Sequence, residues 1–442
     1  MKIWEKGISS DKKMEAFTVG NDRKLDLHLA KYDVLASIAH AEMLGKTALI
    51  TEKESISLRN ALKEILKDIE TAVFTIEPEF EDVHSKIEFL LIQKLGDVGK
   101  KIHAARSRND QVLVALHLYL KHEIEEINAL TKNLFDLLLS LAEKHKDVLV
   151  PGYTHMQIAM PSSFGLWFSA YAESLIDDIY LLNSVYKIVD QNPLGSAAGY
   201  GSSFPIDRKF TTEKLGFETL KYNSIAAQMS RGKMEKTTAF VLSNIGATLS
   251  KMAMDICLYL CQNFNFISFP DELTTGSSIM PHKKNPDIFE LIRAKCNKIQ
   301  SAPQELMLLT TNLPSGYHRD FQLTKGIIIP TVENLKTCLE MMAYSLARVK
   351  VNTKILNDEK YEFIFSVDTL NEMVKKGVPF RNAYQKMASE IENGTFKAKK
   401  DARHTHIGSM GNLCLAEIKE KMRKALSNIT GICHSERNII EP

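Results

Sequence analysis

The sequence predicts an all-α protein built around a bundle of long helices. Of its 442 residues, only 21 are glycine and 13 are proline, well below the roughly 12% that these two residues together average in proteins. Sheet proteins need many turns, and turns use glycine and proline. Apolar residues also recur at steps of three and four over long stretches, which is the helical period. We therefore expect long helices and few strands.

The charge balance and the cysteines exclude several classes of protein. Lysine and arginine number 56 against 54 acidic residues, which gives no basic patch for nucleic acid or an anionic membrane. No stretch approaches the roughly eighteen apolar residues of a membrane span. The six cysteines form no CxxC pair, which is typical of a reducing compartment, and the first residues lack the apolar segment of a signal peptide. We expect a cytoplasmic protein with no nucleic-acid or membrane partner.

Three α-rich segments are expected in order along the chain. Residues 1–107 alternate short amphipathic helices with loops and predict an N-terminal helical domain. Residues 108–356 hold the long helices and predict a central bundle domain. Residues 357–442 return to short, mixed patterns and predict a small C-terminal helical domain.

The middle segment contains five helical blocks. The first is apolar at helical spacing from Val112 to Leu141, which predicts a helix on the order of 50 Å long. Further blocks span 162–191 and about 231–262, and two more begin at Pro286 and near Pro330. Because these helices are apolar on more than one face, they must be buried on all sides. We infer a central bundle shared between subunits; a large monomeric bundle is the alternative.

The most informative segment is TGSSIMPHKKNPD, residues 275–287. Asn285 followed by Pro286 predicts the start of a helix, with Asn as N-cap and Pro at the first helical position. Backbone N–H groups, lysines and the positive end of a helix together favour a carboxylate ligand. A surface turn explains GSS alone but not the full GSSxMPxKxN string. By contrast GSAAGYGSS, residues 195–203, lacks the ending of a phosphate loop and is expected to be a structural turn.

Two further segments flank the longest helix. ARSRNDQV, residues 105–112, places Arg108 and Asn109 at the helix start, where Arg is a natural bidentate partner for a carboxylate; a solvated capping cluster is the alternative. PGYTHMQ, residues 151–157, places Thr154 and His155 between two long helices. A structural role is the alternative for His155, but Glu290 offers it a carboxylate partner for proton transfer.

Together with EDVHS at residues 81–85, these motifs resemble the argininosuccinate lyase family. The GSSxMPxKxN loop is common to the fumarase/aspartase superfamily, whereas SRNDQV, GYTHxQ and DVHS are similar to argininosuccinate lyases in particular. The resemblance covers about residues 4 to 380. It implies a three-domain, fumarase/aspartase-type fold whose central helical bundle is shared in a homotetramer, with each active site built from three subunits.

The activity that the resemblance implies is a carbon–nitrogen lyase of arginine biosynthesis, which splits L-argininosuccinate into L-arginine and fumarate by β-elimination. It implies a small-molecule substrate and neither metal nor organic cofactor. Such an enzyme removes a proton next to a carboxylate and must stabilise the added charge. The resemblance implies that Ser277 and His155 are the acid/base pair, that Lys283 stabilises the Ser277 alkoxide, and that Glu290 pairs with His155. Which of Ser277 and His155 accepts the proton stays open.

The resemblance also implies ten residues that bind substrate, with Asn285 at the fumarate end. They are Asp26, Asp82, His84, Arg108, Asn109, Thr154, Asn285, Tyr317, Gln322 and Lys325.

Near the arginine end, the sequence departs from the family pattern. That pattern reads roughly YNKDxQEDKE, whereas residues 317–326 read YHRDFQLTKG. His318, Arg319, Leu323 and Thr324 therefore differ, and Asp22 stands where a serine is usual. These changes favour a rearranged arginine end. They leave open a superfamily lyase that releases fumarate from another N-substituted aspartate. A catalytically silent structural relative is a further alternative, against which the intact Ser277, Lys283, Asn285, His155 and Glu290 argue.

Overall fold

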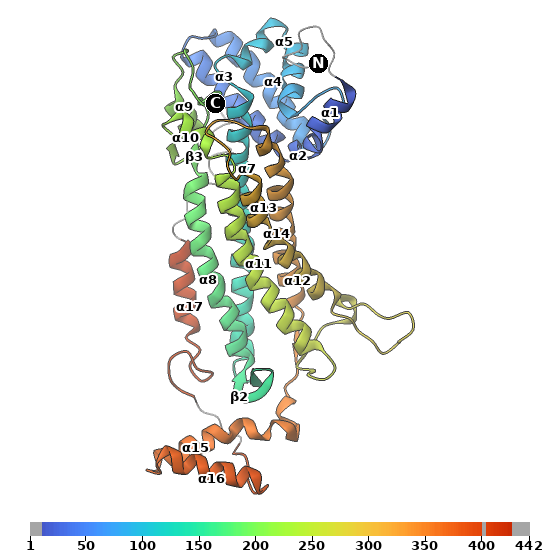
Figure 1. The fold of residues 1–442 in the computed structure, drawn as a ribbon, viewed down its shortest axis with the longest axis vertical. Helices are drawn as coiled ribbons and strands as arrows, with labels where there is room; N and C mark the ends of the chain where they lie inside the picture. Colours follow the sequence, from blue (N-terminus) through green and yellow to red (C-terminus); the bar gives the residue numbers. More distant parts are fainter. Residues whose placement is uncertain (1–10, 400–403, 427–442) are drawn as a thin grey trace.

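The computed structural model describes residues 11–399 and 404–426, and it is almost entirely helical (Figure 1). The expected all-α class is confirmed. Helices from the N-terminal part of the chain lie at one end of the molecule, where α4 and α5 pack on α3 and α3 packs on α7. These N-terminal elements are α1 (Lys12–Val19), α2 (Asp22–Asp26), α3 (Ala30–Lys46), α4 (Glu52–Glu70), α5 (Val83–Leu95), α6 (Asp97–Lys100) and the 3₁₀ helix η1 (Lys101–His103).

Long helices running side by side form the middle of the molecule (Figure 1). The longest, α7, begins directly after Ser107, whose hydroxyl and backbone form a capping box with Asp110. It runs for 37 residues, or about 55 Å. The bundle helices are α7 (Arg108–Lys144), α8 (Phe164–Val189), α11 (Lys233–Leu260), α12 (Asp287–Ile299), α13 (Ala302–Leu309) and α14 (Lys325–Leu346). Short helices α9 (Arg208–Lys214) and α10 (Ser224–Met229) lie near its upper end.

Two of the expected helix starts are wrong. The fifth block begins at Lys325 rather than near Pro330, because Pro330 lies on the second turn and the helix continues through it. The fourth begins at Asp287, so Pro286 and not Asn285 is the N-cap residue. The side chain of Asn285 donates instead to Thr275 Oγ1 and to the Gly276 carbonyl, each at 3.3 Å.

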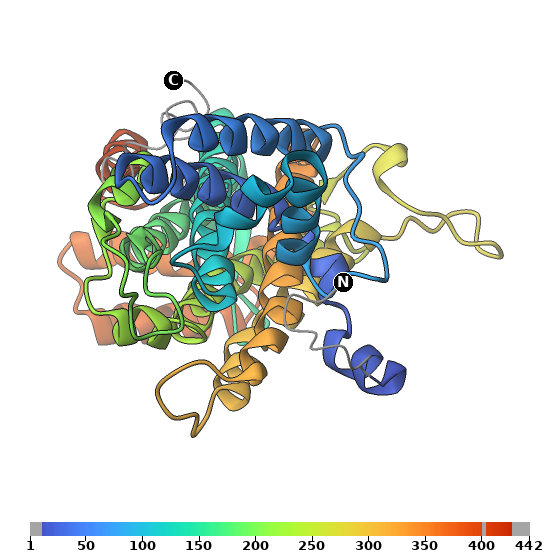
Figure 2. The ribbon, with the colours of Figure 1, turned by 90° about the horizontal axis from the view of Figure 1, so that it is seen from above.

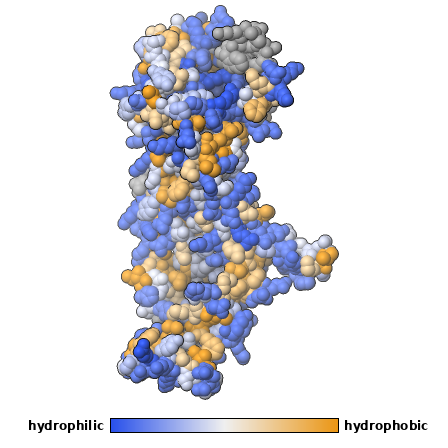
Figure 3. Space-filling model, viewed as in Figure 1, coloured by the Kyte–Doolittle hydropathy of each residue, from blue (hydrophilic) through white to orange (hydrophobic). Residues whose placement is uncertain are grey.

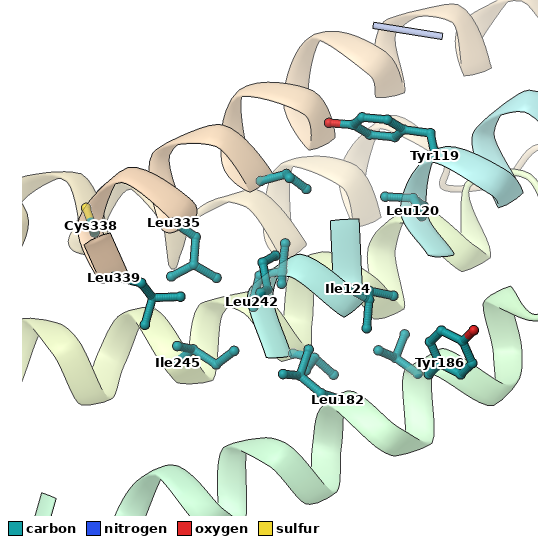
Figure 4. Close-up of a cluster of buried hydrophobic side chains, with 14 of the residues drawn as sticks. Tyr119, Leu120, Ile124, Leu182, Tyr186, Leu242, Ile245, Leu335, Cys338 and Leu339 are labelled. Atoms are coloured by element: carbon teal, nitrogen blue, oxygen red, sulfur yellow. The ribbon is translucent and has the colours of Figure 1, made fainter. Parts of the chain in front are cut away.

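A continuous apolar core joins α7, α8, α11 and α14 (Figure 4). Leu120, Ile124, Leu182, Leu242 and Leu335 are completely buried there. The expected turn at residues 195–203 packs onto the head of this bundle. The N–H groups of its Gly195 and Ala197 donate to the buried carboxylate of Asp110, at 3.0 and 2.9 Å, which confirms a structural role.

Strands are few and short. β1 (Leu149–Thr154) and β2 (Gln157–Ser163) form an antiparallel hairpin at the end of the bundle opposite the N-terminal helices (Figure 1). Two further pairs consist of two-residue strands. β3 (Gln191–Asn192) pairs in parallel with β4 (Thr219–Leu220). β5 (Ile267–Ser268) pairs antiparallel with β6 (Lys350–Val351). The remaining 3₁₀ helices are η2 (Asp271–Leu273), η3 (Arg319–Thr324), η4 (Ile355–Asn357) and η5 (Glu359–Phe365).

The last helices divide between two places. α15 (Ser366–Lys375) and α16 (Phe380–Glu392) pack on each other beyond the hairpin, whereas α17 (Leu415–Leu426) returns along α8 (Figure 1). Asn183 Nδ2 on α8 donates to the Ala425 carbonyl of α17 at 2.7 Å. No helix of the described chain has the length and apolarity needed to cross a membrane.

Apolar side chains remain exposed along the bundle (Figure 3). Phe240 and Met254 on α11 are 55% and 42% exposed, and Leu291 on α12 is 60% exposed.

Candidate active site

A cavity of about 260 Å³ lies where the N-terminal helices meet the head of the bundle. Its walls come from α2, the start of α5, the start of α7 and the segment from Tyr317 into α14. Eight of the residues implied by the family motifs line it together. They are Asp26, Asp82, His84, Arg108, Asn109, Tyr317, Gln322 and Lys325.

Five further residues line the same cavity. Asp22 and Arg319 depart from the family pattern, Glu81 belongs to the EDVHS motif, and Val112 and Arg231 line the site without an expected role there. Arg231 is buried, and its guanidinium donates to Glu235 Oε1 at 2.9 Å and to the Phe321 carbonyl at 3.0 Å. An arginine in an apolar helical block, four residues before a glutamate, was the sequence signal for it.

Lys325 is the buried cation at the centre of the cavity wall. Its Nζ lies 2.5 Å from Asp26 Oδ1 and 3.1 Å from Asp22 Oδ1. Asp26 is itself fixed, because its other oxygen accepts from the Val83 N–H at 3.3 Å. Burial raises the pKa of Asp22 to about 6, although Lys325 lowers it and Asp26 raises it further. One lysine therefore pairs with two carboxylates, and burial disfavours the charged form of Asp22.

A second network joins arginines to carboxylates across the cavity. Arg108 Nη1 lies 3.1 Å from Glu81 Oε2 and 3.1 Å from Asp82 Oδ2. Arg319 Nη2 lies 2.9 Å from Glu81 Oε1 and donates to the Thr18 carbonyl at 3.0 Å. Burial opposes the charge of Glu81, but the two arginines hold its pKa below its ordinary value. Arg319 thus supplies a positive charge at the altered arginine end, and its bond to the Thr18 carbonyl connects this segment to the N-terminal helices.

The other lining residues are held by local structure. Asp82 is the N-cap of α5, where its Oδ1 accepts from the Ser85 N–H at 2.8 Å. Gln322 donates to the Thr18 carbonyl at 2.7 Å. Asn109 lies in the first turn of α7, next to the Ser107 cap. The Tyr317 ring packs 6.2 Å from that of Phe321 and is 36% exposed.

Thr154 and His155 lie far from this cavity. His155 and Met156 form the two-residue turn of the β1–β2 hairpin, with φ of 52° and 59°, and Thr154 pairs with Gln157 at its base. Positive φ at both turn residues matches the twist of a hairpin but is uncommon without glycine. The turn places the exposed imidazole of His155 at the tip of the hairpin. Strain of this kind is found where function requires a residue in one place.

Ser277, Lys283 and Asn285 lie in a loop that projects from the side of the molecule (Figures 1 and 2). The loop is closed at its base by a bridge between Thr275 and Asn285, whose N–H donates to the Thr275 carbonyl at 2.8 Å. Within the loop, the Ser277 hydroxyl accepts from the Met280 N–H at 3.2 Å. Its tip is exposed, with 82% of Ile279 accessible.

Glu290 lies on the first turn of α12, and it is exposed. Its carboxylate lies 3.9 Å from Arg293. Within the described residues of one chain, no ion pair or hydrogen bond joins it to His155. The four expected catalytic residues are therefore spread over the hairpin, the loop and α12, and none of them lines the cavity of its own chain.

Comparison with known proteins places the chain among lyases. A family model described as "Lyase" matches residues 5–301. A curated argininosuccinate lyase from Bacteroides fragilis is 53% identical over 441 residues, which cover 99% of each chain. The argininosuccinate lyase of Parabacteroides distasonis is 53% identical, and the match covers 97% of this chain and 96% of the relative. The argininosuccinate lyase of Thermotoga neapolitana is 43% identical, and the match covers 88% of this chain and 98% of the relative.

The chain belongs to the argininosuccinate lyase family. Membership confirms the resemblance to this family and makes the protein a carbon–nitrogen lyase. Two solved structures of lower identity share its fold. A variant of EDDS lyase with bound fumarate superposes with a TM-score of 0.79 at 19% identity, covering 98% of this chain and 93% of the other. A class II fumarase from Schistosoma mansoni superposes with a TM-score of 0.70 at 17% identity, covering 93% and 95%.

Proposed function

We propose that this argininosuccinate lyase family member cleaves L-argininosuccinate into L-arginine and fumarate, with Ser277 and His155 as the acid/base pair. Full-length relatives at 53% identity that bear this name carry the proposal. A base takes the proton from the carbon next to a carboxylate, the electron pair forms the double bond of fumarate, and the carbon–nitrogen bond breaks. An acid then protonates the leaving nitrogen of arginine.

The charges of the described residues suit the two ends of this substrate. The cavity is lined by the carboxylates of Asp22, Asp26, Glu81 and Asp82, each paired with Lys325, Arg108 or Arg319. This mixed set of charges matches the guanidinium and carboxylate groups of the arginine end. The projecting loop offers Lys283, Asn285 and backbone N–H groups, which match a carboxylate whose charge grows in the transition state. Glu290 is proposed to orient His155, and Thr154 to bind substrate.

We also propose a homotetramer in which three subunits build each active site. Arg108 and Thr154 stand near opposite ends of α7, a helix about 55 Å long, so one chain does not bring them to a common substrate. Exposed apolar residues along the bundle, such as Phe240 and Leu291, support burial against other copies. We further propose three domains, of residues 1–107, 108–356 and 357–442. The first boundary is supported by Ser107, which caps the first bundle helix.

A fumarate-release assay tests the proposed reaction against its alternatives. Argininosuccinate, adenylosuccinate, malate and aspartate are supplied separately at equal concentration, and the fastest turnover is expected with argininosuccinate. Leu323 is 60% exposed and Thr324 bonds Glu235 Oε1 at 3.2 Å, so neither of these altered residues lines the cavity. Faster turnover of another substrate identifies a different lyase. If none of the four substrates is turned over, the protein is a silent relative.

We also propose a cytoplasmic location. The five described cysteines all carry free thiols, which is typical of a reducing compartment.

A further inference from the structure

A buried carboxylate lies directly behind one wall of the cavity. Asp33 on α3 is only 1% exposed, and its Oδ1 lies 3.1 Å from Nδ1 of His84. His84 lines the cavity, whereas Asp33 does not. The imidazole of His84 therefore turns Nδ1 toward α3, which leaves Nε2 as its polar atom for the cavity.

Burial of Asp33 must be compensated, because a buried carboxylate without a partner is strongly destabilising. Both of its oxygens are buried and make no hydrogen bond within residues 11–399 and 404–426. The compensation comes from two cations, the His84 ring and the guanidinium of Arg106, which attracts Asp33 electrostatically. Arg106 is held in place by Ser37, one helical turn after Asp33, whose hydroxyl accepts from Nη1 at 2.9 Å.

Charged groups from several neighbouring elements act on His84. Asp33 faces it from α3, Asp26 from α2 and Asp82 from the start of α5, while His103 lies on the segment before α7. Burial opposes the charge of the His84 ring, but Asp33, followed by Asp82 and Asp26, more than offsets burial and raises the pKa of His84. His103 is different, because burial and the nearby arginines lower its pKa to about 4.

The partner of His84 lies outside the cavity, as does Glu235, the partner of Arg231, whereas three other cations at the site have partners inside it. Arg108, Arg319 and Lys325 each pair with a carboxylate that itself lines the cavity. A ligand carboxylate approaching these cations competes with a protein carboxylate. Asp33 stabilises the charge of His84 from behind and leaves the cavity side of the ring for the ligand.

We propose that Asp33 is a positioning residue of the active site, which orients His84 and keeps its ring protonated so that Nε2 donates to a carboxylate of the substrate. This inference rests on the proposed function, because the ligand is a carboxylate of argininosuccinate. Asp33 acts only through His84 and does not touch the substrate.

The test is the pH profile of kcat/KM for Asp33→Asn, which removes the charge and keeps the shape. His84 then deprotonates at lower pH, so we expect a loss of about tenfold near pH 8 that shrinks to less than about threefold near pH 6. The pKa of Asp22, about 6, also falls in this range. Its titration affects wild type and variant alike, so it cancels in the ratio of their kcat/KM values. An equal loss at every pH, or no loss, overturns the proposal.

Two further variants keep the test decisive. His84→Gln is expected to lose the same alkaline limb, and adding Asp33→Asn to it should change kcat/KM by less than about twofold. If Asp33→Asn fails to fold, a normal pH profile in His84→Gln overturns the proposal. Asp368→Asn is the matched control, because Asp368 pairs with His404 at 2.7 Å away from the cavity, and its profile should match wild type. Wild-type protein that releases no fumarate refutes the proposed function instead.

Discussion

Nζ of Lys325 lies 2.5 Å from Oδ1 of Asp26, although 299 positions separate the two residues in the chain. Both side chains are nearly inaccessible, at 4% and 1%. The pair joins α14 of the bundle to α2 of the N-terminal helices, and a second carboxylate, Asp22, shares the lysine. The lining of the cavity and the contact between α2 and α14 therefore both depend on Lys325.

Replacing Lys325 with Met should destabilise the protein as well as inactivate it. The substitution leaves Asp22 and Asp26 buried without their cation, which costs about 3–5 kcal/mol. Unfolding in urea at fixed protein concentration measures this loss. Lys132→Met is the control: its partner Asp136 is 47% exposed, as is Lys132 itself, so a loss below about 1 kcal/mol is expected. Equal losses in the two variants would contradict the buried-pair interpretation.

The raised pKa of Asp22 predicts a specific dependence of stability on pH. Its pKa is about 6 in the folded protein against an ordinary value of 3.8, so the folded state binds the proton more tightly. The contribution of Asp22 to stability is then greatest below about pH 4 and is lost as pH rises through about 6, by at most about 3 kcal/mol. The difference in unfolding free energy between wild type and Asp22→Asn should change across this window. A constant difference refutes the assignment.

Ser277→Ala should remove most activity without disturbing assembly. The residue lies in a projecting loop outside the core, and loss of a proton-transfer group reduces kcat by about 10²–10⁴-fold. Fumarate release gives the rate, and sedimentation gives the oligomeric state. Ser278→Ala is the matched control, since Ser278 is its exposed neighbour; activity within about twofold of wild type is expected there. Near-normal turnover by Ser277→Ala is the outcome that excludes its proposed role.

Two inactive variants should rescue each other if subunits share the active site. His155→Ala and Ser277→Ala each remove one group of the acid/base pair, and these groups lie on the hairpin and on the loop. Mixed tetramers bring an intact hairpin from one subunit to an intact loop from another. Co-refolding the two variants should therefore restore fumarate release, while each refolded alone stays inactive. A mixture that never recovers activity counts against the shared site.

Local patterns predicted the helices well, because helical period and the absence of breakers act over neighbouring residues. Residues 112–141 lie within α7, and 231–262 contains α11 almost to the residue. The start at Pro330 was wrong because a proline on the second turn does not end a helix whose other side chains are buried. The prediction of Asn285 as a cap was wrong because its side chain instead donates to Thr275 Oγ1 and to the Gly276 carbonyl.

Family motifs located the cavity residues but not the residues that act behind them. Lys325 and Asp26 belong to recognisable strings, so their meeting in one cavity was foreseeable. Asp33 carries no motif, and its importance arises from its contact with His84 in the folded chain. Arg231 also stands outside the motifs, although it lines the cavity itself. Periodicity describes which face of a helix is apolar, and it says nothing about which distant charge will face a buried one.

The length of α7 has a consequence for the assembled enzyme. This helix of 37 residues fixes the distance between the cavity near its first turn and the hairpin beyond its last. Deleting four residues in its middle would shorten it by about 6 Å and rotate the two ends by about 40° relative to each other. In a shared-site tetramer, every hairpin would then miss its neighbour's loop, so all the active sites would fail together.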